Sequence, residues 1–481
     1  MKNIKRIAAC FIAVIMCLGV LVGCSEDDGS DTMPGNVVDT GVSESGAKLN
    51  LPELDYDGAE ISILVRTQSL ANHYAEDIAG SVTSQAVFER NVIVEQLLDV
   101  TLKFKDLNGY SSGATEFSNA IRTSAMSDGT YDIVSPPQTF GNTLIAEGMY
   151  TDLNKYEYLD LSETYWADGY NKQALVNGKQ YTISGDYSID LLTETRVIFM
   201  NKAYLNIFGD AIENPYTLAK EGKWTLAKLL EISKTVTYDV DNSGTWDDKD
   251  QYGWYMYGGD FSAMATSSDI NYITKDGDDY YFTIAEEKSL LLYETLTNAM
   301  NDSTIRYFAQ DQTSMVNSFL RGRAMFFSYG LGYASELKSS NIEYGIIVPP
   351  KYDEEQEEYR IGSNGLTVFA ITTGLTEERA TRSAAVLQAL GYYTHTKVIP
   401  VFFETFLQGQ VAQDIESYEM LETIRANAYF DVGLVFSRSL SNIYGAYQDA
   451  YSKNLGLSTW WEQNERICNT SLNELINSFK D

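Results

Sequence analysis

The stretch GRAMFFSYGLGYASEL, residues 322–337, precedes YGIIVPPK, residues 344–351, by six residues. The runs RGRAMFFSYG and YGIIVPP are short, apolar and rich in aromatic or β-branched side chains, which predicts two strands. Two prolines end the second run, as expected where a strand passes into a loop. The pair therefore belongs to a sheet in the second half of the chain.

The flanking sequence extends this sheet and then changes character. On the N-terminal side, TRVIFMNKAYL at 195–205 opens the same α/β region, and a helix is predicted from about Trp224. On the C-terminal side, GLTVFAI at 365–371 predicts a strand of another layer. From Thr376 onward the pattern is helical, because this threonine can cap a helix whose first turn is acidic and whose apolar residues share one face. The rest of the chain reads as helices with no clear strand.

A separate α/β region occupies the first half of the chain. Strands with apolar, β-branched character alternate there with segments of helical periodicity, an order typical of a mostly parallel sheet. The predicted order is strand 60–66, helix 84–100, strand 101–104, helix 114–126 and strand 131–137.

Length and charge narrow the classes of function. A chain of 481 residues is too long for one hydrophobic core, so two or more lobes are expected. The formal net charge of −32, with no block of lysine or arginine, disfavours nucleic acid and anionic lipid as partners. Of the 4 cysteines, three lie within the first 24 residues, which leaves Cys468 without a disulfide partner.

The N-terminus has the layout of an export signal. Lys2, Lys5 and Arg6 precede an apolar run at 7–22, which is short for a membrane-spanning helix. Leu21-Val22-Gly23-Cys24 resembles the lipobox of bacterial lipoproteins, which implies that Cys24 carries a lipid after cleavage. A retained anchor helix and an incidental cysteine are the alternatives. We predict a lipoprotein signal peptide at 1–23 and, because the next segment is acidic and glycine-rich, a disordered tether at 24–54.

Three stretches, taken in order, are similar to one family. They are YDIVSPPQTFGNTLIAEGMYTDL at 131–153, GDYSIDLLTETRVIFMNKAYL at 185–205, and the opening stretch through 351. Together they resemble extracellular solute-binding lipoproteins of carbohydrate ABC importers, the family 1, maltose-binding-protein-like group. The resemblance implies a monomer on the outer face of the cell membrane that captures a sugar or oligosaccharide and delivers it to an ABC permease. It also implies no catalytic cofactor.

The fold class implied by this resemblance is α/β, a two-lobe periplasmic-binding-protein-like fold. Each lobe is discontinuous, a hinge joins them, and a helical C-terminal region follows. We expect lobe 1 to comprise 55–190 with 366–405, and lobe 2 to comprise 191–365 with 406–481. Solute would lie in the cleft between the lobes, and closure would be a hinge motion.

Candidate ligand residues follow from sugar chemistry and from the sheet rule. Sugar rings stack on aromatic faces, their hydroxyls bond polar side chains, and open α/β sheets bind ligands at the carboxyl ends of strands. The resembled family places a stacking aromatic where this chain has Tyr329, although it often has tryptophan there. For each candidate, packing or a salt bridge is the alternative role. The candidates are Arg66, Gln138, Asp186, Tyr187, Trp254, Tyr255, Tyr329, Tyr333 and Asn364.

The stretch DVDNSGTWDDKD, residues 239–250, matches the spacing of an EF-hand calcium loop. Oxygen-bearing side chains fall at the first, third, fifth, ninth and twelfth places, with Gly244 at the sixth. Aspartate replaces the usual glutamate at the twelfth place, so weaker calcium binding is expected. The alternative is a plain solvated acidic turn. The predicted ligands of a structural Ca²⁺ are Asp239, Asp241, Ser243, the carbonyl of Thr245, Asp247 and Asp250.

Catalytic patterns are weak. The 2 histidines, His73 and His395, lie in no metal-ligand or nucleophile motif. No glycine-rich phosphate loop is complete, and 67 acidic residues make any chosen carboxylate pair uninformative. We therefore predict a binding protein and not an enzyme. A secreted carbohydrate-active enzyme and a peptide-binding receptor of the same fold are the alternatives.

Overall fold

The computed structural model describes residues 46–481 with short gaps. The predicted signal peptide, most of the predicted tether, Cys24 and Asn364 lie outside the described residues. The gaps are 78–79, 128, 278, 309–310, 338–339, 364, 411–414 and 481, and side chains are also not described at 307–308, 312 and 406–410.

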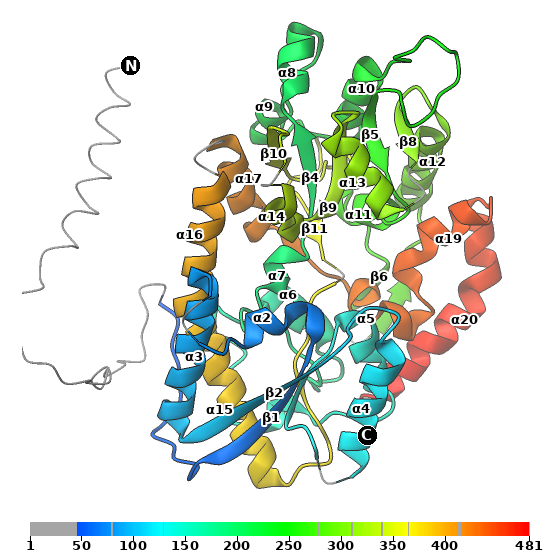
Figure 1. The fold of residues 1–481 in the computed structure, drawn as a ribbon. Coiled ribbons are helices and arrows are strands. Elements are labelled where there is room, and N and C mark those ends of the chain that lie inside the picture. Colours follow the sequence, from blue (N-terminus) through cyan, green and yellow to red (C-terminus); the bar gives the residue numbers. More distant parts are fainter. Residues whose placement is uncertain are drawn as a thin grey trace, which may run out of the picture. The chain divides into compact units, whose positions relative to one another are not determined.

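The first sheet has the strand order β12-β3-β1-β2. Figure 1 labels β1 and β2, which lie side by side in this sheet. β1 pairs in parallel with β2 and β3, while β12 runs antiparallel to β3. Ile63 and Leu64 of β1 point to opposite faces and are both buried, as expected of a central strand covered on both sides. The bounds are β1 Ala59–Arg66, β2 Val100–Leu107, β3 Ile133–Ser135 and β12 Ala370–Ile371.

The helices of this region begin and end close to the predicted positions. α4, Ala114–Met126, matches its predicted bounds, and α3, Val82–Leu98, is capped by Ser81, whose hydroxyl accepts from the Ser84 amide. The Thr376 hydroxyl accepts from the Arg379 amide and so caps α15, Glu377–Tyr393, which confirms the predicted start.

The second sheet has the order β10-β4-β9-β5-β8. β9, β5 and β8 are parallel, whereas β4 is antiparallel to both of its neighbours. The strands are β4 Arg196–Asn201, β5 Tyr252–Met256, β8 Arg306–Phe308, β9 Ala324–Gly330 and β10 Tyr344–Ile347. The longer helices are α10 Leu226–Val236, α11 Asp260–Ser267, α12 Glu287–Asn301 and α13 Gln312–Leu320.

The chain crosses between the sheets more than once. It leaves the first sheet after β3, passes through α7 at Asp190–Thr193 and enters the second sheet at β4. It returns between β10 and β12. All strands of each sheet lie inside the segments predicted for that lobe, and the lobe boundaries themselves remain a prediction.

The C-terminal region is helical, with one exception. β13, Ala428–Tyr429, pairs in parallel with β11, Ile361–Gly362, so the prediction of no strand was wrong there. A long-range partner alone makes this two-residue strand, and local sequence carries no sign of it. The helices are α16 Ile399–Gln410, α17 Ile415–Ala426, α18 Val432–Val435, α19 Ala446–Ser452 and α20 Leu457–Asn477.

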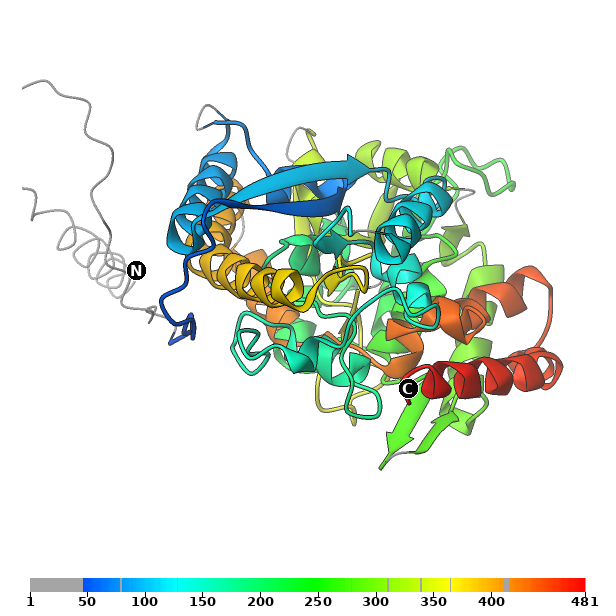
Figure 2. The same ribbon diagram turned by 90° about the horizontal axis from the view of Figure 1, so that it is seen from below.

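The C-terminal region contacts both halves of the molecule. The Gln138 side-chain amide donates to the Leu434 carbonyl at 2.7 Å, and Asp431 Oδ2 accepts from the Tyr272 amide at 2.6 Å. α20 lies beside the β6–β7 hairpin, Ile273–Asp276 and Asp279–Phe282, where the rings of Phe282 and Trp461 are 5.1 Å apart (Figure 2).

Shorter helices connect the strands and the longer helices of both halves. They are α2 Leu70–His73, α5 Gln138–Gly141, α6 Asp168–Ala174, α8 Ala203–Phe208, α9 Pro215–Lys220 and α14 Ala334–Leu337.

Membrane-spanning character is missing from the part of the chain that the structure describes. Within it, no helix combines the length and the hydropathy that crossing a bilayer requires.

Candidate functional site

Tyrosines gather at the carboxyl ends of β5 and β9 in the second sheet. Tyr257 directly follows β5, and Tyr329 and Tyr333 lie at the end of β9 and in the turn after it. All three side chains are partly buried and lie on the edge of the hydrophobic core. The ring centres of Tyr329 and Tyr333 are 4.8 Å apart, and the ring planes are inclined at 60° in an edge-to-face contact. This edge of the sheet therefore presents aromatic surface, as a sugar site requires.

An arginine lies beneath this aromatic surface. Arg196, the first residue of β4, places its guanidinium carbon 5.9 Å from the centre of the Tyr329 ring. Its Nη2 is 3.8 Å from Oδ1 of Asp260, whose side chain is buried. Burial raises the pKa of Tyr329 and the nearby Arg196 cation lowers it, with smaller contributions from Glu194, Tyr110 and Tyr257. These groups therefore share one electrostatic environment.

The carboxyl end of β1 in the first sheet is built differently. Arg66 is only 7% exposed, and its Nη2 forms an ion pair with Asp190 at 2.8 Å. The Arg66 guanidinium also donates to the Gly365 carbonyl at 2.8 Å, and it lies 3.5 Å from the Glu194 carboxylate. Burial alone would raise the pKa of Asp190, but Arg66 and the Thr367 hydroxyl hold it below its usual value. The sequence left two roles open for Arg66, ligand contact and a salt bridge. In the structure Arg66 forms the salt bridge.

The turn after β2 lies next to this ion pair. The Gln68 side-chain amide donates to Oδ1 of Asn108 at 2.9 Å, and Gln68 Oε1 accepts from the Gly109 amide at 2.9 Å. Tyr110, at the tip of this turn, is 66% exposed. This tyrosine from the first half of the chain acts electrostatically on Tyr329 in the second half. Tyr110 of the first half therefore lies close enough to Tyr329 of the second half for their charges to interact.

Several predicted ligand residues have other roles in the structure. Tyr187 packs against His73 and Phe369 at ring distances of 4.9 and 4.7 Å, and Trp254 and Tyr255 lie fully buried within β5. Such burial gives these three a packing role in place of ligand contact. Gln138 is also buried and bonded to the C-terminal region, and the Asp186 carboxylate is 2.6 Å from His395 Nδ1.

Four residues near Tyr329 are not among the candidates from the sequence: Tyr110, Glu194, Arg196 and Tyr257. Tyr257 directly follows β5, and this place after a strand is the signal that could have selected it. Tyr110 lies in a turn too polar to stand out, and Arg196 and Glu194 flank the start of a strand, where no local pattern marks a ligand.

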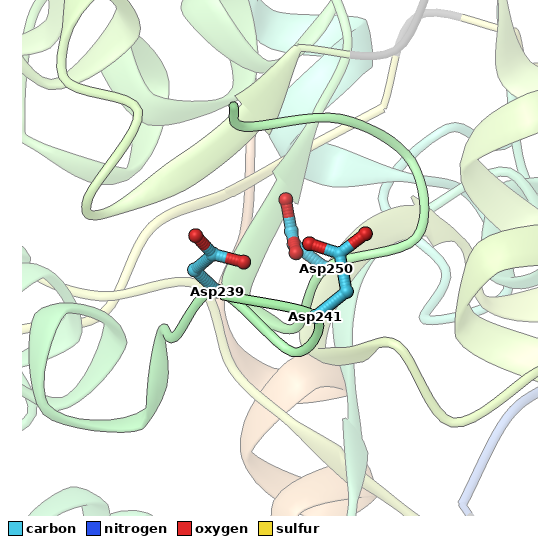
Figure 3. Close-up of side chains that lie close together, drawn as sticks. All are labelled: Asp239, Asp241 and Asp250. Carbon is cyan, nitrogen blue, oxygen red and sulfur yellow. The ribbon is translucent and has the colours of Figure 1, made fainter. Parts of the chain in front are cut away.

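The acidic loop brings three of its predicted ligands together. One carboxylate oxygen from each of Asp239, Asp241 and Asp250 lies within 4.8 Å of the other two (Figure 3). Asp250 is buried, and its carboxylate accepts from the backbone amides of Val240 and Asp247. Three of the residues that the EF-hand-like spacing selects therefore also lie close together in space.

The other predicted ligands of the loop have different partners. The Asp247 carboxylate forms an ion pair with Lys249 at 2.9 Å, and the Ser243 hydroxyl donates to the Thr245 carbonyl at 3.2 Å. Gly244 has φ +73°, a conformation that favours glycine and lets its amide donate to Asp239 at 2.7 Å. Calcium takes 6–8 oxygen ligands. The three grouped carboxylates supply only part of such a shell.

The sequence matches one family model. Residues 80–373 match the model described as "Bacterial extracellular solute-binding protein", which is more than half of the chain. The chain therefore belongs to the bacterial extracellular solute-binding proteins, and it is a binding protein and not an enzyme. No curated protein sequence matches it.

Solved structures of low sequence identity share the fold. An ABC substrate-binding protein of Listeria monocytogenes in complex with cycloalternan has a TM-score of 0.58 at 14% identity, over 87% of this chain and 100% of that one. The maltose/maltodextrin-binding domain MalE of Bdellovibrio bacteriovorus, bound to maltotriose, gives 0.56 at 14%, over 86% and 100%. UgpB of Mycobacterium tuberculosis, in complex with glycerophosphocholine, gives 0.55 at 13%, over 88% and 100%. The α/β, two-lobe, maltose-binding-protein-like fold predicted from the sequence is thereby confirmed.

Proposed function

We propose that this protein is a lipid-anchored receptor that captures a sugar or oligosaccharide between its lobes and delivers it to an ABC permease. The single observation that supports this most is the tyrosine group at the carboxyl ends of β5 and β9, in a chain of the solute-binding family. Stacking on these rings would hold the apolar faces of a sugar, and closure would bury its hydroxyls. The cycloalternan and maltotriose complexes of similar folds support the same ligand class.

The proposed ligand site joins predicted and newly located residues. Tyr329 and Tyr333 are retained from the sequence prediction because both rings are partly exposed. Asn364 lies outside the described residues and stays a candidate from the sequence alone. Tyr110, Tyr257, Glu194 and Arg196 are added because they share the electrostatic environment of Tyr329.

Thermal unfolding with a ligand panel tests this proposal. The body from Ser25 onward is heated with maltotriose, cyclic and linear oligosaccharides, monosaccharides, glycerophosphocholine and short peptides. A ligand at a hundred times its dissociation constant adds about 2.7 kcal/mol to stability. A rise in Tm with one sugar class supports the proposal and identifies the substrate. A rise with peptides alone, or with glycerophosphocholine alone, would overturn the carbohydrate assignment.

The lipid anchor is proposed at Cys24, from the lipobox-like sequence that precedes it. We expect Cys24→Ala to release the protein into the medium of the producing cell. The matched control is Cys468→Ala, which removes a buried thiol of α20. Intact-mass analysis of the membrane-bound form should find a diacylglycerol on Cys24. Retention of the C24A protein in the membrane fraction would contradict the anchor.

A structural calcium ion is proposed for the loop 239–250. The three converging carboxylates support it, because Ca²⁺ binds clustered oxygen ligands. Added Ca²⁺ should raise Tm in the parent protein but not in an Asp239→Asn/Asp241→Asn variant. Asp248→Asn, an exposed acid of the same loop that is not a predicted ligand, should keep the effect. If Ca²⁺ does not raise the Tm of the parent protein, the calcium site is excluded and the loop is a plain solvated acidic turn.

A further inference from the structure

Asp260 is a buried carboxylate behind the tyrosine surface, and no ligand role has been assigned to it. It is the first residue of α11, and its side chain is fully buried. Its Oδ2 accepts from the Tyr257 amide at 2.8 Å. Its Oδ1 has no hydrogen-bond partner among the described residues and faces Arg196 Nη2 at 3.8 Å. An ionised group in such surroundings needs its cation, because an unpaired buried charge is strongly unfavourable.

The two carboxylate oxygens of Asp260 contact two different parts of the proposed solute site. Through Oδ2 it holds the backbone of Tyr257, and through Oδ1 it attracts the guanidinium that lies beneath the Tyr329 ring. A shift of the Arg196 side chain by about 1 Å would bring the pair to the length of a charge-assisted hydrogen bond. One carboxylate therefore acts on both tyrosines at the carboxyl edge of this sheet.

Gly259 leaves the space that Arg196 occupies. A Cβ built at this position would lie 2.8 Å from Arg196 Nη2. Its backbone is ordinary, with φ −66° and ψ −16°, so alanine would be tolerated there without backbone strain. An alanine at this place would oblige the Arg196 guanidinium to move, without any change in the turn.

We propose that Asp260 is a positioning residue of the solute site, which holds Arg196 beneath Tyr329 and the Tyr257 backbone beside it. This inference rests on the proposed function for its ligand but not for its geometry. A cation beneath an aromatic face fixes the ring and leaves other guanidinium N–H groups free to meet solute hydroxyls. Solute affinity thus depends on a carboxylate that the solute does not touch.

Because Asp260 is titratable, its proposed role predicts that solute affinity depends on pH. It faces Arg196 of β4, Ser328 of β9 and the Tyr257 amide, and Glu194 and Tyr444 lie near Arg196. Burial raises the pKa of Asp260 to about 6. Below that pH the neutral acid no longer attracts Arg196, so affinity should fall as the pH drops from 7.5 to 5.5.

Titration calorimetry with maltotriose tests the proposal. We expect Asp260→Asn and Gly259→Ala each to weaken binding about five- to tenfold at pH 7.5. In D260N the affinity should no longer depend on pH between 7.5 and 5.5. Arg196→Lys, which keeps the charge but loses the planar fork, should also weaken binding. Parent-like affinity and pH profile in both D260N and G259A would overturn the proposal.

A matched control and a ligand-free measurement complete the test. Asp132→Asn disrupts another buried aspartate–arginine pair, with Arg379 at 2.9 Å, at the amino end of β3, and should leave affinity unchanged. The side-chain ¹⁵Nε signal of Arg196, assigned with R196K, should be resolved in the parent and move to the position of free arginine in D260N. If no sugar binds the parent, the proposed function fails, and this signal still decides the role of Asp260. A signal unchanged in D260N would overturn that role.

Discussion

At the carboxyl end of β1 the Arg66 guanidinium is buried and paired with Asp190, whereas at the start of β4 the Arg196 side chain is 19% exposed and lies under a tyrosine. Both arginines lie where α/β sheets commonly bind ligands. Arg66 belongs to an ion-pair network whose members bind one another. Arg196 supports exposed aromatic surface. Position at a sheet edge therefore selects candidates, and only the partners of each side chain separate a structural role from a binding role.

The largest expected effect comes from breaking the ion pair of the first sheet. Arg66→Met leaves the Asp190 carboxylate buried without its cation, which costs about 3–5 kcal/mol of unfolding free energy. Urea denaturation at pH 7 measures this. Arg122→Met breaks an ion pair whose side chains are 34% and 39% exposed, and should cost less than about 1 kcal/mol. If R66M is as stable as the parent but fails to bind sugar, the contrast between the two edges is wrong.

The second-largest effect concerns the tyrosine site, where a ring at the sheet edge is compared with a ring of the core. Tyr329→Ala removes the stacking ring and should weaken maltotriose binding about thirtyfold, a loss of about 2 kcal/mol, with little loss of stability. Tyr187→Ala is the matched comparison, because this fully buried ring belongs to the core. It should instead cost about 3–5 kcal/mol of stability. Normal affinity in Y329A together with a large stability loss would make Tyr329 a core residue.

A third prediction concerns acid sensitivity on the side of the first sheet. Burial lowers the pKa of His73 from 6.5 to about 3, with Arg90 and Arg66 acting in the same direction and Asp190 opposing them. The folded state then binds fewer protons than the unfolded one, so stability is lost as pH falls from about 6.5 towards 3. Between pH 7 and 5 the loss should be about 1–2 kcal/mol. His73→Leu should flatten this slope in denaturation curves, and an unchanged slope would exclude His73 as its source.

The smallest expected effect tests whether the first half of the chain contributes to the tyrosine site. Tyr110→Ala removes a ring that is 66% exposed, so stability should not change. Maltotriose affinity should fall about threefold if this ring contacts the solute when the lobes close. Tyr281→Ala, which removes a 46% exposed ring of the β6–β7 hairpin, is the control and should have no effect. Equal affinities in both variants would confine the site to the second half.

Local sequence predicted the elements better than the site. The bounds of α4, the Thr376 cap of α15 and the alternation of strands and helices along the first half follow from periodicity and capping, which are properties of neighbouring residues. Among the site candidates, Tyr329 and Tyr333 stay predictions, and they were selected because they lie at the end of a well-marked strand and in the turn after it. Trp254 and Tyr255, by contrast, lie inside β5 and are fully buried, and no local pattern distinguishes a buried aromatic residue of a strand from one at its end.

Patterns in the amino-acid sequence were enough to predict the family, the two α/β regions, the helical C-terminal region and the spacing of the acidic loop. Each depends on patterns within about 30 residues, where chain geometry leaves few alternatives. Only the tertiary structure paired Arg66 with Asp190 and Gly365, brought Asp260 to Arg196, and joined β11 to β13. These contacts join residues far apart in the chain, and whether an arginine is buried or exposed depends on the packing of the whole fold around it.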